Sequence, residues 1–179
     1  MKSIAVYCGA AHGADPRYAD AARALAQSLV EHNIGLVYGG GKVGLMGVIA
    51  DEVLRLGGEA TGVIPKALLE REVGHAGLTR LFVVKDMHER KAMMSDLAEG
   101  FIAMPGGMGT LEELFEMITW AQLGIHAKPI GLLNVDGFYD KLAGFVAHLV
   151  ETGFVRPAHA ALMQLEAEPD ALIRRLRGG

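Results

Sequence analysis

Residues 101–113 read FIAMPGGMGTLEE, and this stretch decides the fold. Its first four residues are apolar and indicate a buried strand, while the residues from Leu111 onward follow the pattern of an amphipathic helix. A glycine-rich turn between a strand and a helix points free backbone N–H groups and the positive end of the helix dipole at one place. An anion, most often a phosphate, is the expected ligand there.

The acidic residue after this turn has two interpretations. Thr110 is placed to cap the helix through its hydroxyl, and Glu113 follows three residues later, as in a capping box. Alternatively, Glu113 is a carboxylate placed beside a bound phosphate ester to do chemistry on it. The spacing alone leaves both interpretations open.

The composition is that of a globular protein. The chain has 179 residues, 51% hydrophobic and 21% charged, which favours one domain with a sizeable core. Its formal net charge of -4 does not favour nucleic acid as a partner. Cys8 is the one cysteine, and no Cys/His spacing suggests a metal. With no signal-peptide pattern and no apolar run near ~20 residues, we expect a cytoplasmic protein without a membrane partner.

Short apolar runs alternate with helical patterns along the chain. We predict strands at 3–8, 34–38, 60–64, 80–84, 101–104 and 129–133. We predict helices at 16–32, 45–56, 86–99, 111–123, 137–152 and 169–177. This alternation indicates a Rossmann-like, doubly wound α/β fold: a parallel sheet with helices on both faces, in a single domain over 1–179. Ligands of such folds bind at the carboxyl ends of the strands, near the switch point.

A second glycine cluster occupies residues 39–47 and follows the second predicted strand. It contains a G-x-G-x-x-G match, the pattern of a dinucleotide-binding motif. Two observations weaken that interpretation: the match does not follow the first strand, and no acidic residue ends the strand after it. A Walker A motif does not fit, because valine follows the lysine. Either these glycines allow tight helix–strand packing, or Gly39, Gly40 and Gly41 pass close to a bound nucleotide.

The helix predicted at 86–99 begins with an unusual concentration of charge. Arg90 and Lys91 lie near its first turn, where cations oppose the helix dipole and an anionic ligand would relieve the conflict. With the 105–110 turn and Glu113, the stretch 87–91 resembles the LOG ("lonely guy") family. These are cytokinin riboside 5′-monophosphate phosphoribohydrolases, often mislabelled as lysine decarboxylases. The resemblance spans nearly the whole chain.

The resemblance implies a Rossmann-like homodimer with its site near the subunit interface and no cofactor. It also implies hydrolysis of the N-glycosidic bond of an adenosine-type 5′-monophosphate to a free base and ribose 5-phosphate. Arg90 and Glu113 match the family's catalytic pair. The family's substrate-binding positions match Glu72, Lys91, Gly107, Met108, Gly109, Thr110, Leu111, Glu112 and Thr119. One departure is Ala10-Ala11, where relatives often carry a serine near the phosphate.

The implied chemistry suits these residues. Breaking a ribosyl C–N bond builds positive charge on the sugar, which Glu113 could stabilise while it orients or deprotonates water. Arg90 offers a planar fork for a phosphate or for orienting Glu113. A lysine decarboxylase would instead need pyridoxal phosphate on a lysine, and no lysine is singled out for that role.

Two alternatives stay open at this point. One is an AMP nucleosidase with plain AMP as its main substrate, because the sequence does not reveal the shape of the base pocket. The other is a non-catalytic carrier of nucleotides or of molybdenum cofactor, which would not need the Arg90–Glu113 pair. Single-stranded DNA binding, known in distantly similar folds, lacks the support of a stripe of basic and aromatic residues.

Overall fold

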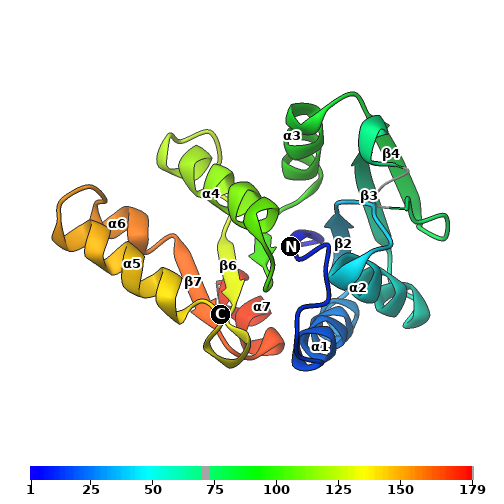
Figure 1. Cartoon of the computed structure of the whole chain (residues 1–179), viewed down its shortest axis with the longest axis horizontal. Helices are drawn as coiled ribbons and strands as arrows, with labels where there is room; N and C mark the ends of the chain where they lie inside the picture. Colours follow the sequence, from blue (N-terminus) through cyan, green and yellow to red (C-terminus); the bar gives the residue numbers. More distant parts are fainter. Residues whose placement is uncertain (70–72, 179) are drawn as a thin grey trace.

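The computed structural model describes residues 1–69 and 73–178, and within them seven parallel strands form one sheet (Figure 1). The strand order is β4-β3-β2-β1-β5-β6-β7. The strands are β1 (Ser3–Tyr7), β2 (Gly35–Tyr38), β3 (Ala60–Pro65), β4 (Arg80–Val84), β5 (Phe101–Ala103), β6 (Ile130–Leu133) and β7 (Met163–Glu166). The chain winds outward from β1 on one side and from β5 on the other, so the switch point lies between these two strands.

Helices cover both faces of the sheet (Figure 1). One face carries α1 (Arg17–Glu31), α2 (Gly44–Arg55) and α7 (Pro169–Leu176). The other face carries α3 (Met87–Leu97), α4 (Met108–Gln122) and α5 (Asp140–Glu151). Short elements complete the described chain: η1 (Lys66–Leu68), η2 (Val135–Gly137) and α6 (Pro157–Ala160). The predicted fold class, a Rossmann-like α/β sheet covered on both faces, is confirmed.

The central strand β1 shows why the sequence folds this way. Ile4 and Val6 belong to the core beneath α1 and α2, whereas Ala5 and Tyr7 belong to the core beneath α3 and α4. Alternate side chains of a strand point to opposite faces, so a strand that is apolar throughout is buried on both.

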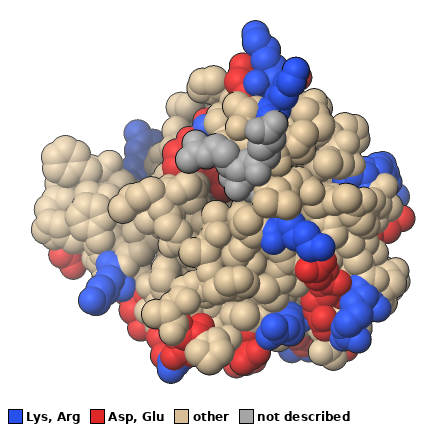
Figure 2. Space-filling view, turned by 45° about the vertical axis from the view of Figure 1, so that its right-hand side comes forward, with Lys and Arg blue, Asp and Glu red and all other residues tan. Residues whose placement is uncertain are grey.

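The charged side chains and the lengths of the helices describe the protein further. On the face shown in Figure 2, basic and acidic side chains lie interspersed around a broad uncharged surface. Among residues 1–69 and 73–178, no helix is both long and apolar enough to cross a bilayer.

Three local expectations differ from the structure. The edge strand β7 was not predicted, because its four half-buried residues alternate apolar and polar instead of forming an apolar run. The helix α4 begins at Met108, three residues before the predicted start at Leu111. The helix α1 begins at Arg17, one residue after the predicted start, because Pro16 is its N-cap and the Asp15 carboxylate accepts a hydrogen bond from the Arg17 N–H at 2.9 Å.

His126 holds the end of α4 against the sheet. Its Nε2 donates to the Met117 carbonyl at 2.9 Å, and its Nδ1 accepts from the Lys128 N–H at 3.1 Å. The ring also packs on Phe101, with 5.2 Å between ring centroids. Burial lowers the pKa of His126, although the bond to Met117 opposes this shift. The folded protein therefore favours the neutral ring, because a second ring proton would displace the Lys128 N–H.

This pKa shift predicts an acid-sensitive fold. The unfolded chain binds the His126 proton more readily, so the free energy of unfolding should fall as the pH drops below about 6.5, the ordinary histidine pKa. The loss should continue until the pH reaches the lowered pKa of the folded state. His126→Gln should flatten this part of the profile in urea unfolding measured between pH 7 and 5. The exposed His148→Gln serves as the control, and an unchanged slope in His126→Gln would contradict the assignment.

Candidate active site

The first turn of α4 forms the centre of the candidate site. The helix begins at Met108 with Gly107 as its N-cap, and no side chain caps it. The predicted capping box is therefore wrong, because Thr110 lies inside the first turn, buried against Gly106. Within the described part of the chain, the N–H groups of Met108, Gly109 and Thr110 have no backbone acceptor. These donors and the positive end of the helix dipole suit an anion.

The glycines of this turn serve two different purposes. A Cβ at Gly106 would lie 2.1 Å from Thr110 Oγ1 and 2.9 Å from the Gly9 nitrogen, so packing requires this glycine. A Cβ at Gly107 or Gly109 would meet no described protein atom within 4 Å. The room beside these two residues is therefore open to a ligand.

Arg90, in the first turn of α3, is buried with 5% of its surface exposed. Its Nε donates to the Val63 carbonyl at 3.1 Å and its Nη2 to the Gly39 carbonyl at 3.0 Å. A Cβ at Gly39 would lie 2.0 Å from that Nη2. The guanidinium is thus fixed across the ends of β2 and β3, and Gly39 has to be glycine to admit it.

Lys91 is also buried, but it turns toward α4 instead of the cavity. Its Nζ forms ion pairs with Glu112 and, at 3.0 Å, with Glu116. Burial lowers the pKa of Lys91, but the two carboxylates outweigh burial and the net shift is upward. Lys91 is therefore a protonated clamp between α3 and α4.

A cavity of about 260 Å³ opens between these elements. It brings the predicted catalytic pair, Arg90 and Glu113, together at the first turn of α4. Its lining residues are Cys8, Ala10, Met46, Leu68, Met87, Arg90, Gly107, Gly109, Thr110, Glu112 and Glu113. Four predicted binding residues are thus part of this cavity, and the predicted catalytic pair shares its lining with the open glycines.

The other predicted binding residues lie away from this lining. Met108 is 84% exposed, Leu111 packs against the core, and Thr119 lies on the exposed side of α4, where its Oγ1 donates to the Phe115 carbonyl at 2.7 Å. Three glycines of the second cluster line neither this cavity nor the second one described below: Gly39, Gly40 and Gly41. Glu72 lies outside the described residues.

The apolar wall of the cavity was not predicted from the sequence. Met46 and Met87 begin the helices after β2 and β4, and Leu68 ends η1. The signal was available, because residues that follow the carboxyl ends of parallel strands face the ligand. A methionine beside a charged or glycine-rich motif does not by itself indicate a binding site, so Met46 and Met87 were not selected.

Cys8 and Tyr7 lie beneath the same site. Burial, and then the negative charge of Glu113, raises the pKa of the Cys8 thiol, so Cys8 is not an activated nucleophile. The same two causes raise the pKa of Tyr7, whose ring stacks on Phe101. Both residues are buried, and Cys8 lines the cavity next to the predicted catalytic pair.

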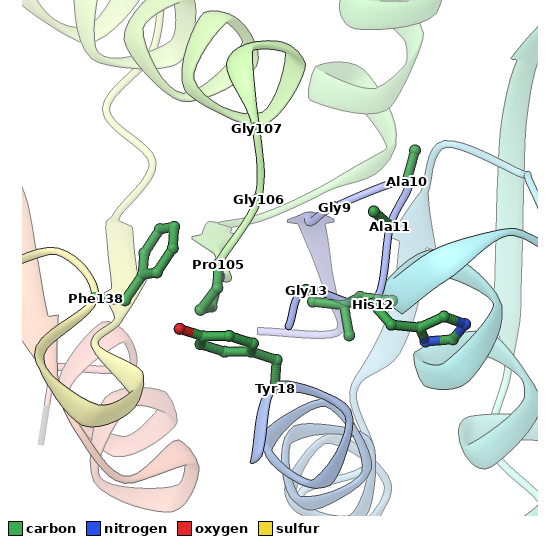
Figure 3. Close-up of a pocket in the computed structure, with 11 residues that line it drawn as sticks. Gly9, Ala10, Ala11, His12, Gly13, Tyr18, Pro105, Gly106, Gly107 and Phe138 are labelled. Carbon is green, nitrogen blue, oxygen red and sulfur yellow. The ribbon is translucent and has the colours of Figure 1, made fainter. Parts of the chain in front are cut away.

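A second cavity, of about 480 Å³, adjoins the first and shares Ala10 and Gly107 with it. Figure 3 shows Tyr18, Phe138 and Pro105 gathered at one end, with the Ala10–Ala11 turn facing them. Neither cavity was predicted as such, because each is assembled from segments far apart in the sequence.

The fold and this turn define a Rossmann-like α/β protein with a candidate anion site at a helix N-terminus. A family model described as "Possible lysine decarboxylase" matches residues 46–176. A probable cytokinin riboside 5′-monophosphate phosphoribohydrolase from Oryza sativa subsp. japonica, LOGL2, is 50% identical over 98% of this chain and 72% of its own. LOG7 from Arabidopsis thaliana, a cytokinin riboside 5′-monophosphate phosphoribohydrolase, is 49% identical over 98% of this chain and 81% of its own. The chain belongs to the LOG family.

Solved structures agree with this fold. A molybdenum cofactor binding protein from Rippkaea orientalis superposes with a TM-score of 0.74 over 99% of this chain and 96% of its own, at 20% identity. The molybdenum cofactor carrier protein from Chlamydomonas reinhardtii gives a TM-score of 0.71 over 100% and 99%, at 19% identity. At these identities the likeness concerns the fold alone.

The open glycines predict a specific defect in anion binding. Gly109→Ala adds a methyl group where the protein has room and should not destabilise the fold, since alanine favours a helix by about 1 kcal/mol over glycine. It should weaken binding of AMP, measured by calorimetry, by roughly tenfold, equivalent to ~1.4 kcal/mol. Gly144→Ala in α5, which also meets no described protein atom within 4 Å, is the matched control. Equal AMP affinity in both variants would refute an anion site at this turn.

Proposed function

We propose that this protein hydrolyses the N-glycosidic bond of N6-substituted adenosine 5′-monophosphates, releasing the free base and ribose 5-phosphate. The observation that carries the proposal is the meeting of Arg90 and Glu113 in one cavity at the open first turn of α4. Its relatives in rice and Arabidopsis are named as phosphoribohydrolases for cytokinin riboside 5′-monophosphates.

Each part of such a nucleotide has a matching part of the cavity. The 5′-phosphate is held by the N–H groups of the α4 first turn, in the room beside Gly107 and Gly109. The base lies against the apolar wall of Met46, Leu68 and Met87, where flexible thioethers adapt to an N6 substituent. The sugar then lies between these ends, beside Arg90 and Glu113.

The reaction needs charge stabilisation and a positioned water. As the bond from the anomeric carbon to the base nitrogen breaks, positive charge develops on the sugar, and the Glu113 carboxylate stabilises it. Glu113 also takes a proton from the water whose oxygen attacks the anomeric carbon, while the departing base gains a proton on a ring nitrogen. Arg90, held by two backbone carbonyls, orients the sugar or the carboxylate.

The family description raises lysine decarboxylation, which the surroundings of Lys91 do not favour. It is the one buried lysine within residues 1–69 and 73–178, and its Nζ is tied to Glu112 and Glu116. Its raised pKa keeps it protonated, whereas a lysine that bonds covalently to pyridoxal phosphate has to react as a free amine.

Product analysis tests the proposed hydrolysis. N6-isopentenyladenosine 5′-monophosphate, AMP and the unphosphorylated riboside should be incubated with the protein, and free base measured by chromatography. Glu113→Gln should lower the rate by about 10²–10⁴-fold, as expected for loss of an acid–base group. Arg90→Lys keeps the charge but loses the fork and should also lose most activity. Glu151→Gln, at an exposed glutamate near the end of α5, is the control.

The substrate series separates the alternatives. The isopentenyl nucleotide should be cleaved fastest, and the unphosphorylated riboside far more slowly, because binding energy from the phosphate positions the sugar. Faster cleavage of AMP would make the protein an AMP nucleosidase. Nucleotide binding without release of any base would refute hydrolysis and favour a carrier.

We further propose that the protein is a homodimer whose site lies near the subunit interface. Large apolar side chains are exposed along and after α4, with Leu123 70% and Ile125 63% exposed. Thr119, which the family places in substrate binding, lies on the exposed side of the same helix. A second copy packed against α4 would cover these residues and bring Thr119 close to a site.

Light scattering tests the assembly. The wild-type protein should have twice the mass of one 19.0 kDa chain. Ile125→Asp should shift the mass toward the monomer without unfolding, whereas Val83→Asp, at a valine 52% exposed on the edge strand β4, should leave it unchanged. A monomeric wild-type mass would contradict the dimer.

A further inference from the structure

The second cavity, bounded by Tyr18 and Phe138, is left unoccupied by the mononucleotide placed as proposed above. Its volume of about 480 Å³ exceeds that of the cavity with the catalytic pair and falls in the range of small-molecule sites. Its described lining consists of glycine, alanine, leucine, proline, histidine and two aromatic residues, with no lysine, arginine or carboxylate. An uncharged, planar group is the occupant that such walls favour.

The aromatic end of this cavity is held in a fixed arrangement. Tyr18 and Phe138 meet edge to face, with 5.9 Å between ring centroids, and Phe138 also contacts the buried Tyr139 at 4.9 Å. Next to these rings, Arg17 on α1 forms an ion pair with Asp136 in η2. Asp136 adopts a left-handed backbone conformation with φ 49°, which costs energy in a residue other than glycine.

The position of this cavity relative to the glycine turn restricts what can enter it. It shares Ala10 and Gly107 with the catalytic cavity, so the two open onto the same phosphate-binding turn. In the proposed function, the base and sugar occupy the catalytic cavity and the phosphate lies at the turn. Only a group attached beyond that phosphate then reaches Tyr18 and Phe138.

We propose that this cavity is a second nucleoside subsite, so that the protein binds dinucleotides joined through a 5′–5′ pyrophosphate. The pyrophosphate spans the turn at Gly107, one nucleoside faces Glu113, and the second base packs against Tyr18 and Phe138. Doubly wound folds bind ligands in this way, across the crevice at the switch point, which here lies between β1 and β5. The inference rests on the proposed placement of the mononucleotide, and it makes dinucleotides competitors of the substrate.

Calorimetry on the Glu113→Gln background tests the subsite without turnover. The probes are AMP, ADP and P1,P2-di(adenosine-5′) diphosphate. The dinucleotide should bind about tenfold more tightly than AMP or ADP, because stacking on an aromatic side chain contributes about that much. Tyr18→Ala should remove this advantage and leave AMP affinity within about twofold. Tyr18→Phe should retain it, and Phe145→Ala, an exposed phenylalanine on α5, is the control for loss of a ring.

Three results would overturn the subsite. If ADP binds as tightly as the dinucleotide, the gain in affinity over AMP comes from the charge of the second phosphate. If Tyr18→Ala weakens AMP and the dinucleotide equally, the cavity belongs to the mononucleotide site. If the dinucleotide binds no better than AMP, or not at all, the cavity is not a nucleoside subsite. Thermal unfolding checks that Tyr18→Ala is folded, and Tyr18→Leu, which keeps apolar volume without a ring, replaces it if it is not.

This test is separate from that of hydrolysis. Tyr18-dependent binding of the dinucleotide in a protein that releases no base would leave the subsite standing while hydrolysis fails. Release of base from the mononucleotide, with no preference for the dinucleotide, would leave hydrolysis standing while the subsite fails.

Discussion

The structure of the site depends on the burial of one guanidinium group. Arg90 lies almost wholly inside the protein, and a buried charge is costly unless hydrogen bonds satisfy it. The carbonyls of Val63 and Gly39 accept two of its N–H groups. One side chain from α3 thus joins the carboxyl ends of β2 and β3. This contact fixes the wall of the cavity opposite the α4 turn. It also fixes the orientation of the Arg90 guanidinium in that wall.

This contact gives the second glycine cluster a structural explanation. Gly39 is glycine because a Cβ would occupy the position of the Arg90 Nη2, and Gly44 is glycine because a Cβ would lie 2.3 Å from the Ala10 backbone. Both are requirements of packing between neighbouring loops. At the α4 turn, by contrast, Gly107 and Gly109 leave room that no described protein atom fills. Similar sequence patterns therefore serve the protein's own packing in one loop and leave open room in the other.

The sequence sufficed for the parallel sheet, because strands buried on both faces have to be apolar, as β5 is throughout and β1 is after Ser3. It also singled out Arg90 and Glu113. Arg90 lies near a helix start, where a cation opposes the helix dipole, and Glu113 follows the glycine turn that is expected to bind an anion. It could not reveal that Lys91, next to Arg90, points at Glu112 and Glu116, because the direction of a helical side chain depends on the neighbouring helix. Nor could it separate a capping threonine from a buried one, since Thr110 suits either role until the start of α4 is known.

The place of the crevice follows from the predicted fold, but the residues that form its walls could not be predicted, for a geometric reason. Parallel strands that wind outward from β1 and β5 leave a crevice between the loops that follow these two strands. The walls of that crevice come from Tyr18 and Phe138, which lie far apart in the chain and become neighbours only when α1 and η2 pack together. Both cavities adjoin the turn at Gly107, which is where the proposed function places the phosphate. Under the two proposals, specificity depends on which groups a ligand carries on either side of that phosphate.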